Sequence, residues 1–489
     1  MQGGSRRGPI AASAIVIGAV GLLAATVATG GHVRLFAPIT LLAVVLVVGS
    51  KRLLAWHSLA AAIVLVVLFV PIKRYELPSS LPFHLEPYRV VVALVAVAWL
   101  TSLLIDPRVR FRRTPIDTPL LLFLFAILGS LLANESRVSS LETEVVKRIA
   151  FFVSFFVVFY FMASVLKRRE QIDFIVNVLV WGGAVVAFFA LVESRTGYNV
   201  FNHLSSWIPG LRVGEVPKTA VRGARLRVYA SAQHPIALGA ALVMLIPLSV
   251  YRGRRTGSRL YWVATTLLLL GALATVSRTA VVMLLVIAFV YLWLRPIETR
   301  RLWPLIVPLL IAVHFAIPGT LGSLKQAFLP KGGLIAQQTN QNIGSGRLAT
   351  LGPALHAEFA PHPLLGEGFG TRVTQPDEVV KVPNAPILDD QWLGTLLETG
   401  VIGTALLAWL ILRFVRRAGR AAKEDPSSRG WLLTATTAGV LAYAVGMFTY
   451  DAFAFIQVTF FFFFFLGLGA ATLQLRADEP SRLDAASRA

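Results

Sequence analysis

Apolar stretches of bilayer-spanning length follow one another along nearly the whole chain, separated by short polar segments. A transmembrane helix needs roughly 20 mainly apolar residues, so each stretch is a candidate span. The candidate spans are residues 10–30, 35–50, 53–71, 90–105, 118–134, 148–166, 172–193, 234–251, 259–277, 280–294, 303–318, 395–414, 431–449 and 453–473. The pattern predicts an all-α polytopic membrane protein with about 14 transmembrane helices. A count of about 12 or 13 is the alternative, because the second and fourth stretches are short and the ninth and tenth are almost continuous.

Basic residues are concentrated at every second junction between the candidate spans. The clusters lie at residues 6–7, 51–52, 108–113, 167–169, 252–259, 295–301 and 413–429 and in the tail from Arg476. Because cytoplasmic loops carry an excess of lysine and arginine, both termini are predicted to be cytoplasmic. The same alternation leaves three longer intervals outside, residues 73–89, 194–233 and 319–394.

Six segments follow from this topology. They are N-terminal transmembrane helices (1–193), an external cationic loop (194–233), central transmembrane helices (234–318), a large external loop expected to carry catalysis (319–394), C-terminal transmembrane helices (395–475) and a disordered cytoplasmic tail (476–489). The first apolar stretch is long enough to span and lacks a convincing cleavage site, which favours a signal anchor over a cleaved signal peptide. We expect function in the external loops, because loops held by a rigid scaffold often carry it.

Composition agrees with a membrane protein and excludes several kinds of site. The 489 residues are 56% hydrophobic and 15% charged, with a mean hydropathy of +0.70. The net charge of +21 is divided among short clusters between apolar stretches, so we expect no nucleic-acid partner. The chain has no cysteine, which excludes disulfides, thiolate metal sites and a cysteine nucleophile. The loops show no convincing metal-ligand spacing, so neither a metal nor another cofactor is expected.

The external interval 194–233 is cationic, which is unusual for an outward-facing loop. Its basic residues are Arg195, Arg212, Lys218, Arg222, Arg225 and Arg227. Guanidinium groups match phosphate oxygens bidentately, so the interval is a candidate diphosphate site. Arg225 and Arg227 precede SAQHPIALG, in which His234 and a proline open a helix whose first amides could add to anion binding. The alternative is that a longer loop tolerates positive charge, or that its arginines contact lipid headgroups.

Two further arginines are candidates for the same role. Arg278, in TVSRTA, lies at the outer end of two nearly continuous spans. An ionisable group at such a depth costs several kcal/mol unless it is paired or lines a polar cavity. It is therefore either a site residue or a side chain that extends to the membrane interface. Arg347 follows a turn-like GSG in the large external loop.

The large external loop contains the segment PHPLLGEGFGT, with glycines at three alternate positions, 366, 368 and 370. No strand precedes them, so we reject a dinucleotide site and predict a tight turn or a close backbone approach. Glu367, between the first two glycines, is an additional candidate site residue, as are Arg222 and His234. His362 and His356 are further candidates, each expected to be structural or at the surface.

The pair Asp389-Asp390 precedes an amphipathic helix start, WLGTLLETGVIG. Aspartate is a favoured N-terminal cap of helices, which is one explanation for the pair. The other is a general base, since a carboxylate near several arginines can accept a proton from a sugar hydroxyl.

Four patches, taken in order, resemble the bacterial O-antigen ligase and O-antigen polymerase family of membrane glycosyltransferases. They are RVYASAQHPIALG, TVSRTA, the pair SGRLATLGPAL and HPLLGEGFGT, and DDQWLGTLLETGVIG. The resemblance covers roughly residues 190–475. It implies a GT-C-like helical fold and metal-independent inverting transfer of glycans from undecaprenyl diphosphate. It also aligns Arg227 and Arg278 with the family's arginines and puts Arg347 in its loop motif.

The resemblance also bears on the activity. Family ligases that attach glycan to lipid A core carry a His-Asn pair where this chain has Asp389-Asp390, which favours a polymerase of surface polysaccharide. We therefore expect transfer of an undecaprenyl-diphosphate-linked glycan to a saccharide acceptor, at the external face of the bacterial cytoplasmic (inner) membrane. A chain-length regulator protein is a further partner that the resemblance allows. The alternatives are an O-antigen ligase, a polysaccharide flippase, and a membrane scaffold.

Overall fold

The computed structural model describes residues 55–78, 85–106, 109–214, 220–222, 225–300, 322, 347–374 and 383–475. Every candidate span that falls within these residues coincides with a helix, which confirms a mainly helical fold. The candidate spans 10–30, 35–50 and 303–318 lie outside the described residues.

The long helices are α4 (Trp56–Phe69), α5 (Pro87–Ile105), α6 (Asp117–Ala133), α8 (Glu142–Val165), α9 (Arg169–Thr196), α11 (Pro235–Thr256), α12 (Leu260–Ala274), α13 (Arg278–Leu294), α19 (Gln391–Glu424), α20 (Ser428–Gly446) and α21 (Ile456–Leu473). Six of the described helices, α5, α8, α9, α11, α19 and α21, are long and apolar enough to cross a bilayer. The chain is thus an integral membrane protein by helix length and composition, while the total number of spans and the orientation stay predictions.

Shorter elements connect the long helices. They are α7 (Glu135–Ser140), η1 (Val200–His203), α10 (Leu204–Trp207), α14 (Pro296–Arg300), α18 (Arg347–Ala354), the π-helical turn η4 (Leu355–Phe359) and η5 (Ala452–Ala454). Two small antiparallel ribbons, which the sequence pattern did not predict, pair β1 (Tyr75–Glu76) with β2 (Arg212–Val213) and β3 (Ala220–Arg222) with β4 (Arg225–Arg227). The first ribbon ties the α4–α5 connection to the interval 194–233.

The core is formed by α11, α20 and α21. In α21, 94% of the apolar window is buried inside the protein, against 22% in α5. Consecutive phenylalanines, residues 460–465, fill the space around α21 and interlock with Phe155 of α8 at a ring distance of 4.8 Å from Phe460. The outer helices instead expose large apolar side chains such as Leu94 and Leu104, as expected where the solvent is lipid.

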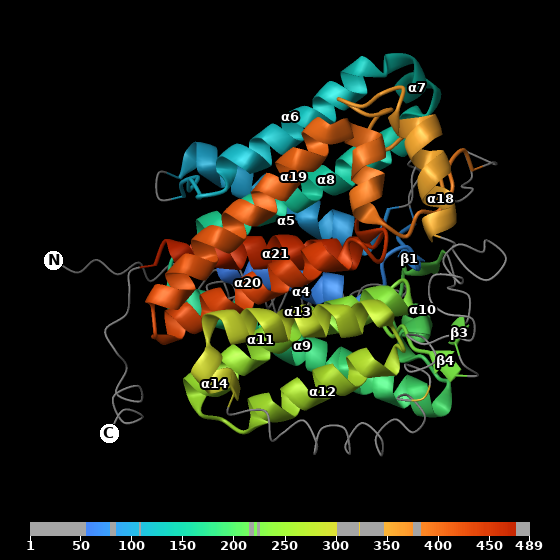
Figure 1. Ribbon diagram of the computed structural model, residues 1–489. Helices are drawn as coiled ribbons and strands as arrows, with labels where there is room; N and C mark the ends of the chain where they lie inside the picture. The colour runs from blue at the N-terminus through green and yellow to red at the C-terminus, as the bar shows by residue number, and fades with distance from the viewer. Residues whose placement is uncertain are drawn as a thin grey trace, which may run out of the picture.

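The described helices run between two ends of the bundle (Figure 1). One, the long-loop end, carries the connections α4–α5, α6–α8, α9–α11, α12–α13, α18–α19 and α20–α21, with the two ribbons. The other, the arginine-rich end, carries the connections α5–α6, α8–α9, α11–α12 and α19–α20 and the start of α14. The basic clusters within the described residues fall at the arginine-rich end, in agreement with the alternation in the sequence. In Figure 1 the ribbons and α18 lie on the right and α14 on the left.

Helix α19 is broken inside. Gly400 has φ 66° and ψ −169°, outside the helical region, and the helix resumes after it. The segment 363–367 runs across the break and replaces the missing helical hydrogen bonds. Glu367 N–H donates to the Leu397 carbonyl (2.9 Å), and Val401 N–H donates to the Pro363 carbonyl (2.9 Å). The sequence analysis expected a loop up to residue 394, but α19 starts at Gln391 and extends ten residues beyond the predicted 414, to Glu424.

The glycines of HPLLGEGFGT allow this crossing. Gly366, Gly368 and Gly370 all have positive φ, at 69°, 112° and 78°. A Cβ on Gly366 would lie 2.5 Å from the Leu397 carbonyl oxygen, and one on Gly400 would lie 2.2 Å from the Leu364 carbonyl oxygen. The prediction of tight turns and a close backbone approach is therefore confirmed.

Candidate active site

The sequence patches converge on the connection between α20 and α21, residues 447–455, which we call the α20–α21 loop. On one side, Thr279 of TVSRTA shares a hydrogen bond of 2.8 Å with Thr449. The ring of His234, from RVYASAQHPIALG, stacks on the ring of Phe455 at 5.5 Å. Two patches more than 40 residues apart in the sequence (278 minus 234 is 44) thus contact the same loop.

The start of α19 meets the other side of the α20–α21 loop. The Gln391 side-chain oxygen accepts from Phe453 N–H (2.7 Å), and Asp390 N–H donates to Asp451 Oδ1 (3.2 Å). Phe152 of α8 packs between Phe453 and Phe369 of GEGFGT, each at 4.9 Å. The loop therefore joins the cationic segments to the acidic one.

Arg227 and Arg278 come together at the turn between α12 and α13. Arg227 is 6% exposed, and its Nε donates to the carbonyl of Thr275 at 3.2 Å. Arg278 is half-buried and begins α13 three residues later. The structure thus places the two predicted arginines on adjoining segments at the long-loop end.

Arg74 is a buried residue of this region that the sequence analysis missed. It is 2% exposed, and its guanidinium donates to the carbonyls of Ala230 (3.3 Å) and Ala232 (3.0 Å) and lies over the Tyr229 ring. Burial lowers the pKa of Arg74. Arg74 could have been singled out from the sequence. It belongs to KRY, which follows an apolar span on the side predicted to be outside, where basic residues are uncommon.

A carboxylate fixes the same segment from the opposite side. Glu193, at the end of α9, is 2% exposed and accepts hydrogen bonds from the N–H groups of Tyr229 (3.3 Å) and Ala230 (2.8 Å). The Asn199 side chain donates to the Ala230 carbonyl (3.1 Å). The backbone that leads from Arg227 to His234 is therefore held by buried polar side chains from two other elements.

Backbone strain is concentrated at the long-loop end. Within the described residues, the non-glycine residues with positive φ are Lys73 (65°), Ala230 (41°), Val276 (49°) and Asp389 (51°). Each such residue costs of order 1–3 kcal/mol and persists only where the surroundings hold it, commonly at functional sites. The last three lie in three of the four sequence patches.

Several polar atoms in the same segments are buried without a hydrogen-bond partner among the described residues. They are Ser231 Oγ, Gln233 Oε1, Ser277 Oγ and Tyr450 Oη. Such atoms are rare in native proteins and often mark places where water, an ion or a substrate binds. They come from the segment before α11, the α12–α13 turn and the α20–α21 loop, so they mark the meeting of these segments.

One family model matches part of the sequence that forms this region. Residues 263–408 match the family model described as O-antigen ligase. This stretch of the chain is therefore similar to the O-antigen ligase family. The matched stretch contains TVSRTA, the large-loop motifs and Asp389-Asp390, while RVYASAQHPIALG precedes it. No curated protein sequence matches the chain.

The match over residues 263–408 confirms the resemblance seen in the sequence. It indicates an O-antigen ligase-type function, carried out by a glycosyltransferase-like enzyme in a membrane on lipid-linked glycan and acceptor substrates. The finer assignments, including the roles of individual residues, remain proposals.

The two aspartates of the O-antigen ligase domain have different surroundings. Asp390 is the N-terminal cap of α19, because its Oδ1 accepts from Leu393 N–H at 3.1 Å. The capping interpretation therefore holds for Asp390. Asp389 is half-buried and lies in the left-handed region.

Asp451 of the α20–α21 loop is a second residue that the sequence analysis missed. Burial raises the pKa of its carboxyl group, and the neighbouring Asp389 carboxylate raises it further, while Arg372 and Arg148 act in the opposite direction. Its position in FTYDAFAF, an isolated acid between two apolar spans, was the available signal.

Glu367 belongs to an ion-pair network beside the point where segment 363–367 crosses α19. Its carboxylate lies 2.9 Å from Arg137 of α7 and 3.3 Å from Arg372, which also pairs with Glu358 at 2.7 Å. Burial raises the pKa of Glu367 to about 7, and the Glu358 carboxylate contributes to the shift. These contacts favour a structural role. His362 and His356 are exposed, as expected for surface histidines.

The remaining predicted residues are placed by their backbone alone. Arg222 and Arg225 face each other as partners in the β3–β4 ribbon, and Arg347 begins α18. Their side chains lie outside the described part of the structure. Within that part, no group of three or more histidine, aspartate or glutamate side chains could hold a metal ion. Metal-independent transfer stays a prediction.

Proposed function

We propose that the protein transfers an undecaprenyl-diphosphate-linked glycan to a sugar hydroxyl at the external face of the bacterial cytoplasmic membrane. The observation that carries this proposal is the convergence of Arg227, Arg278 and Asp389 on the segments around the α20–α21 loop. The convergence brings cationic and acidic groups to one end of a membrane-embedded bundle. A membrane-anchored diphosphate donor and a polar acceptor can both reach such an end.

The arginines would act on the leaving group. The acceptor oxygen attacks the anomeric carbon, the bond between that carbon and the phosphate oxygen breaks, and its electron pair stays on the diphosphate. Arg227 and Arg278, with Arg225 as a further candidate, would stabilise the charge that builds up there. Preorganised cationic donors in a site shielded from water contribute several kcal/mol to a barrier of this kind. The fixed backbone around Ala230 keeps Arg227 in place for this role.

Asp389 would act on the acceptor. Its carboxylate takes the proton of the attacking hydroxyl and later releases it to water, while the glycan is joined to the acceptor and undecaprenyl diphosphate leaves. Asp390 is engaged in capping α19 and would position Asp389. The buried polar atoms Ser277 Oγ and Tyr450 Oη would bind hydroxyl or phosphate oxygens of the substrates.

Within this function, polymerisation of a surface polysaccharide is the favoured activity. The reason is the pair Asp389-Asp390, which stands where family ligases acting on lipid A core carry His-Asn.

The test is transfer by the purified full-length protein in liposomes that contain a lipid-linked repeat unit. We expect release of undecaprenyl diphosphate and a ladder of longer glycans. Transfer to lipid A core without a ladder would instead assign a ligase. Unchanged release by both Arg278→Ala and Asp389→Asn would refute the proposed site.

One observation favours a second candidate, a flippase for lipid-linked glycans. Helix α19 is interrupted at Gly400, and discontinuous helices are common in transporters. Here, however, the segment 363–367 occupies the break and satisfies its backbone groups. Translocation of the lipid-linked glycan across protein-containing vesicles, with no new glycosidic bond, would support the flippase.

A further inference from the structure

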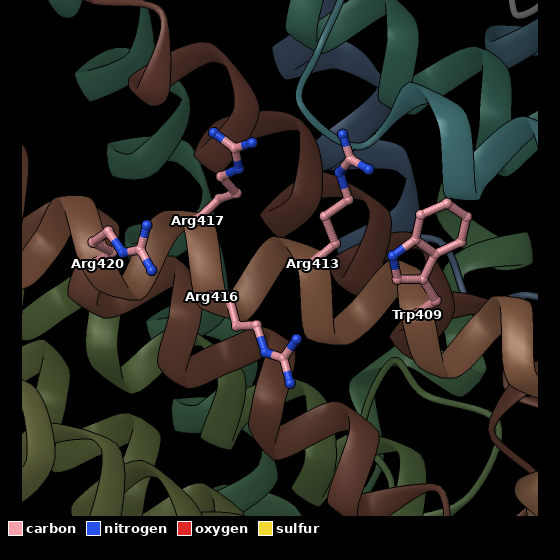
Figure 2. A pocket seen from close by; sticks show the side chains of 5 residues that line it. All are labelled: Trp409, Arg413, Arg416, Arg417 and Arg420. Carbon is pink, nitrogen blue, oxygen red and sulfur yellow. The ribbon is translucent and has the colours of Figure 1, made fainter.

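A groove at the arginine-rich end is lined by one aromatic and four basic side chains, all from the second half of α19. Its volume is about 350 Å³, and the lining residues are Trp409, Arg413, Arg416, Arg417 and Arg420. Figure 2 shows these side chains along one helix, with Trp409 at one end of the row and Arg420 at the other. We call this surface the α19 groove. It lies at the opposite end of the bundle from the candidate active site.

The spacing of the four arginines puts them on one face of α19. Arg413 and Arg417 are four residues apart, as are Arg416 and Arg420, so the members of each pair are neighbours on the helix surface. Like charges at such spacing destabilise a helix. Acidic residues compensate other arginines of the same end: Asp173 lies 3.1 Å from Arg252, and Asp425 lies 2.9 Å from Arg429. No acidic side chain lines the groove in the described part of the chain.

The groove is fixed at its aromatic side. Arg413 Nε donates to the Pro115 carbonyl at 2.7 Å, and the Arg413 guanidinium lies over the Trp409 ring at 5.6 Å. Arg416, Arg417 and Arg420 are exposed. Three accessible guanidinium groups beside this fixed side are suited to binding phosphate oxygens bidentately. Lysine would do so less well, because its ammonium group lacks the planar fork of donors.

The same face of α19 continues into lipid-exposed apolar surface. Trp409 is 38% exposed and Leu412 is 47% exposed, and both lie within one turn of Arg413. Tryptophan is enriched where the headgroups of a bilayer meet its apolar core. A ligand that fills the groove and covers this neighbouring surface must therefore be anionic at one end and apolar at the other.

We propose that the α19 groove binds the phosphate headgroup of an anionic phospholipid in the leaflet next to the arginine-rich end. Arg416, Arg417 and Arg420 contact the phosphate, and the acyl chains lie against Trp409 and Leu412. Anionic lipid headgroups attract clustered arginines at the membrane surface, and the attraction adds up per residue. This binding is independent of glycan transfer and of the residues proposed to carry it.

The test compares lipid binding by full-length protein and two triple variants, measured by native mass spectrometry after titration with phosphatidylglycerol or phosphatidylcholine. The groove variant is Arg416→Gln, Arg417→Gln and Arg420→Gln. The matched control, Arg113→Gln, Arg259→Gln and Arg300→Gln, removes the same charge from exposed arginines of the same end. We expect the wild type to prefer phosphatidylglycerol by about tenfold or more, the control to keep most of that preference, and the groove variant to lose it.

Two results would overturn the proposal. Equal loss of preference in the groove variant and the control would mean that net charge, and not the groove, attracts the lipid. Displacement of phosphatidylglycerol by an equal concentration of inorganic phosphate would mean that the groove recognises free phosphate and gains nothing from the apolar surface beside it. Circular dichroism of both variants checks that they are folded.

Discussion

Both ends of the helix bundle contain arginines, and two pairs of them, one pair at each end, are used differently. At the long-loop end, Arg74 and Arg227 are buried and donate to main-chain carbonyls of neighbouring loops. At the arginine-rich end, Arg252 and Arg255 pair with the same carboxylate, Asp173, at 3.1 and 2.9 Å. The first arrangement shapes a loop, whereas the second neutralises charge.

The difference shows that the number of arginines does not mark the active end. The long-loop end is distinguished by strained backbone at Ala230, Val276 and Asp389. Backbone strain costs free energy, so it is retained where it serves a purpose. Predictions that separate the two ends therefore test the proposed site most directly.

The largest expected effect comes from removing a cation at the long-loop end. Arg278→Ala should lower the rate of glycan transfer by about 1,000-fold, because the charge on the leaving diphosphate loses a preorganised donor. Arg278→Lys should recover part of the rate, since lysine keeps the charge but not the bidentate geometry. The measurement is release of undecaprenyl diphosphate in liposomes at saturating donor.

The matched control for this variant is Arg259→Ala, which removes an exposed arginine from the arginine-rich end. It should transfer glycan within about twofold of wild type, as expected for a surface substitution away from the site. Equal losses in the two variants would show that transfer depends on overall charge and would contradict the distinction between the ends.

The two aspartates provide the next prediction. Asp389→Asn should lower transfer by about 100-fold or more, because an amide cannot accept the hydroxyl proton. Asp390→Asn should be nearly neutral, because asparagine also caps helices well. Measuring the rate of glycan transfer by the two purified variants checks this. A larger loss of rate in Asp390→Asn than in Asp389→Asn would assign the general base to Asp390.

The helical fold was predictable from hydropathy alone, whereas its irregular parts were not. Apolar stretches of spanning length located every described long helix, because lipid forces the backbone to satisfy its own hydrogen bonds. The break at Gly400 was not predicted, because its cause is the remote segment 363–367. The alternate glycines predicted a close approach, but the sequence does not tell what they approach.

The sequence singled out the arginines and acids of the candidate site, but not how their segments meet. Arg227, Arg278 and Asp389 were predicted from charge in unusual places, and the structure brings their segments to one loop. Asp451 was missed as a single charge between two long apolar spans, and Arg74 was missed as part of KRY beside one such span. The role of the α20–α21 loop depends on contacts with segments far away in the sequence, such as that between Thr279 and Thr449, which local patterns do not encode.

A smaller effect is expected where the backbone crosses α19. Gly400→Ala should lower the free energy of unfolding by about 2 kcal/mol or more, because φ is 66° and the new Cβ would lie 2.2 Å from the Leu364 carbonyl oxygen. Gly394→Ala, in the same helix and with its nearest contact at 3.6 Å, should be neutral or slightly stabilising. Thermal unfolding in detergent compares the two variants. Similar unfolding temperatures would contradict the close approach of segment 363–367 to Gly400.

The smallest expected effect is a change in the pH dependence of stability at the long-loop end. The pKa of Glu367 is raised from 4.5 to about 7 in the folded protein, chiefly by burial, so the folded state favours the neutral carboxyl group. Its contribution is greatest below about pH 4.5 and is lost as the pH rises through 7. Glu367→Gln should therefore flatten the fall in unfolding temperature between pH 5 and 8. Glu135→Gln, an exposed acid on α7, should keep the wild-type slope. Equal slopes in all three proteins would mean that Arg137 and Arg372 keep Glu367 ionised throughout.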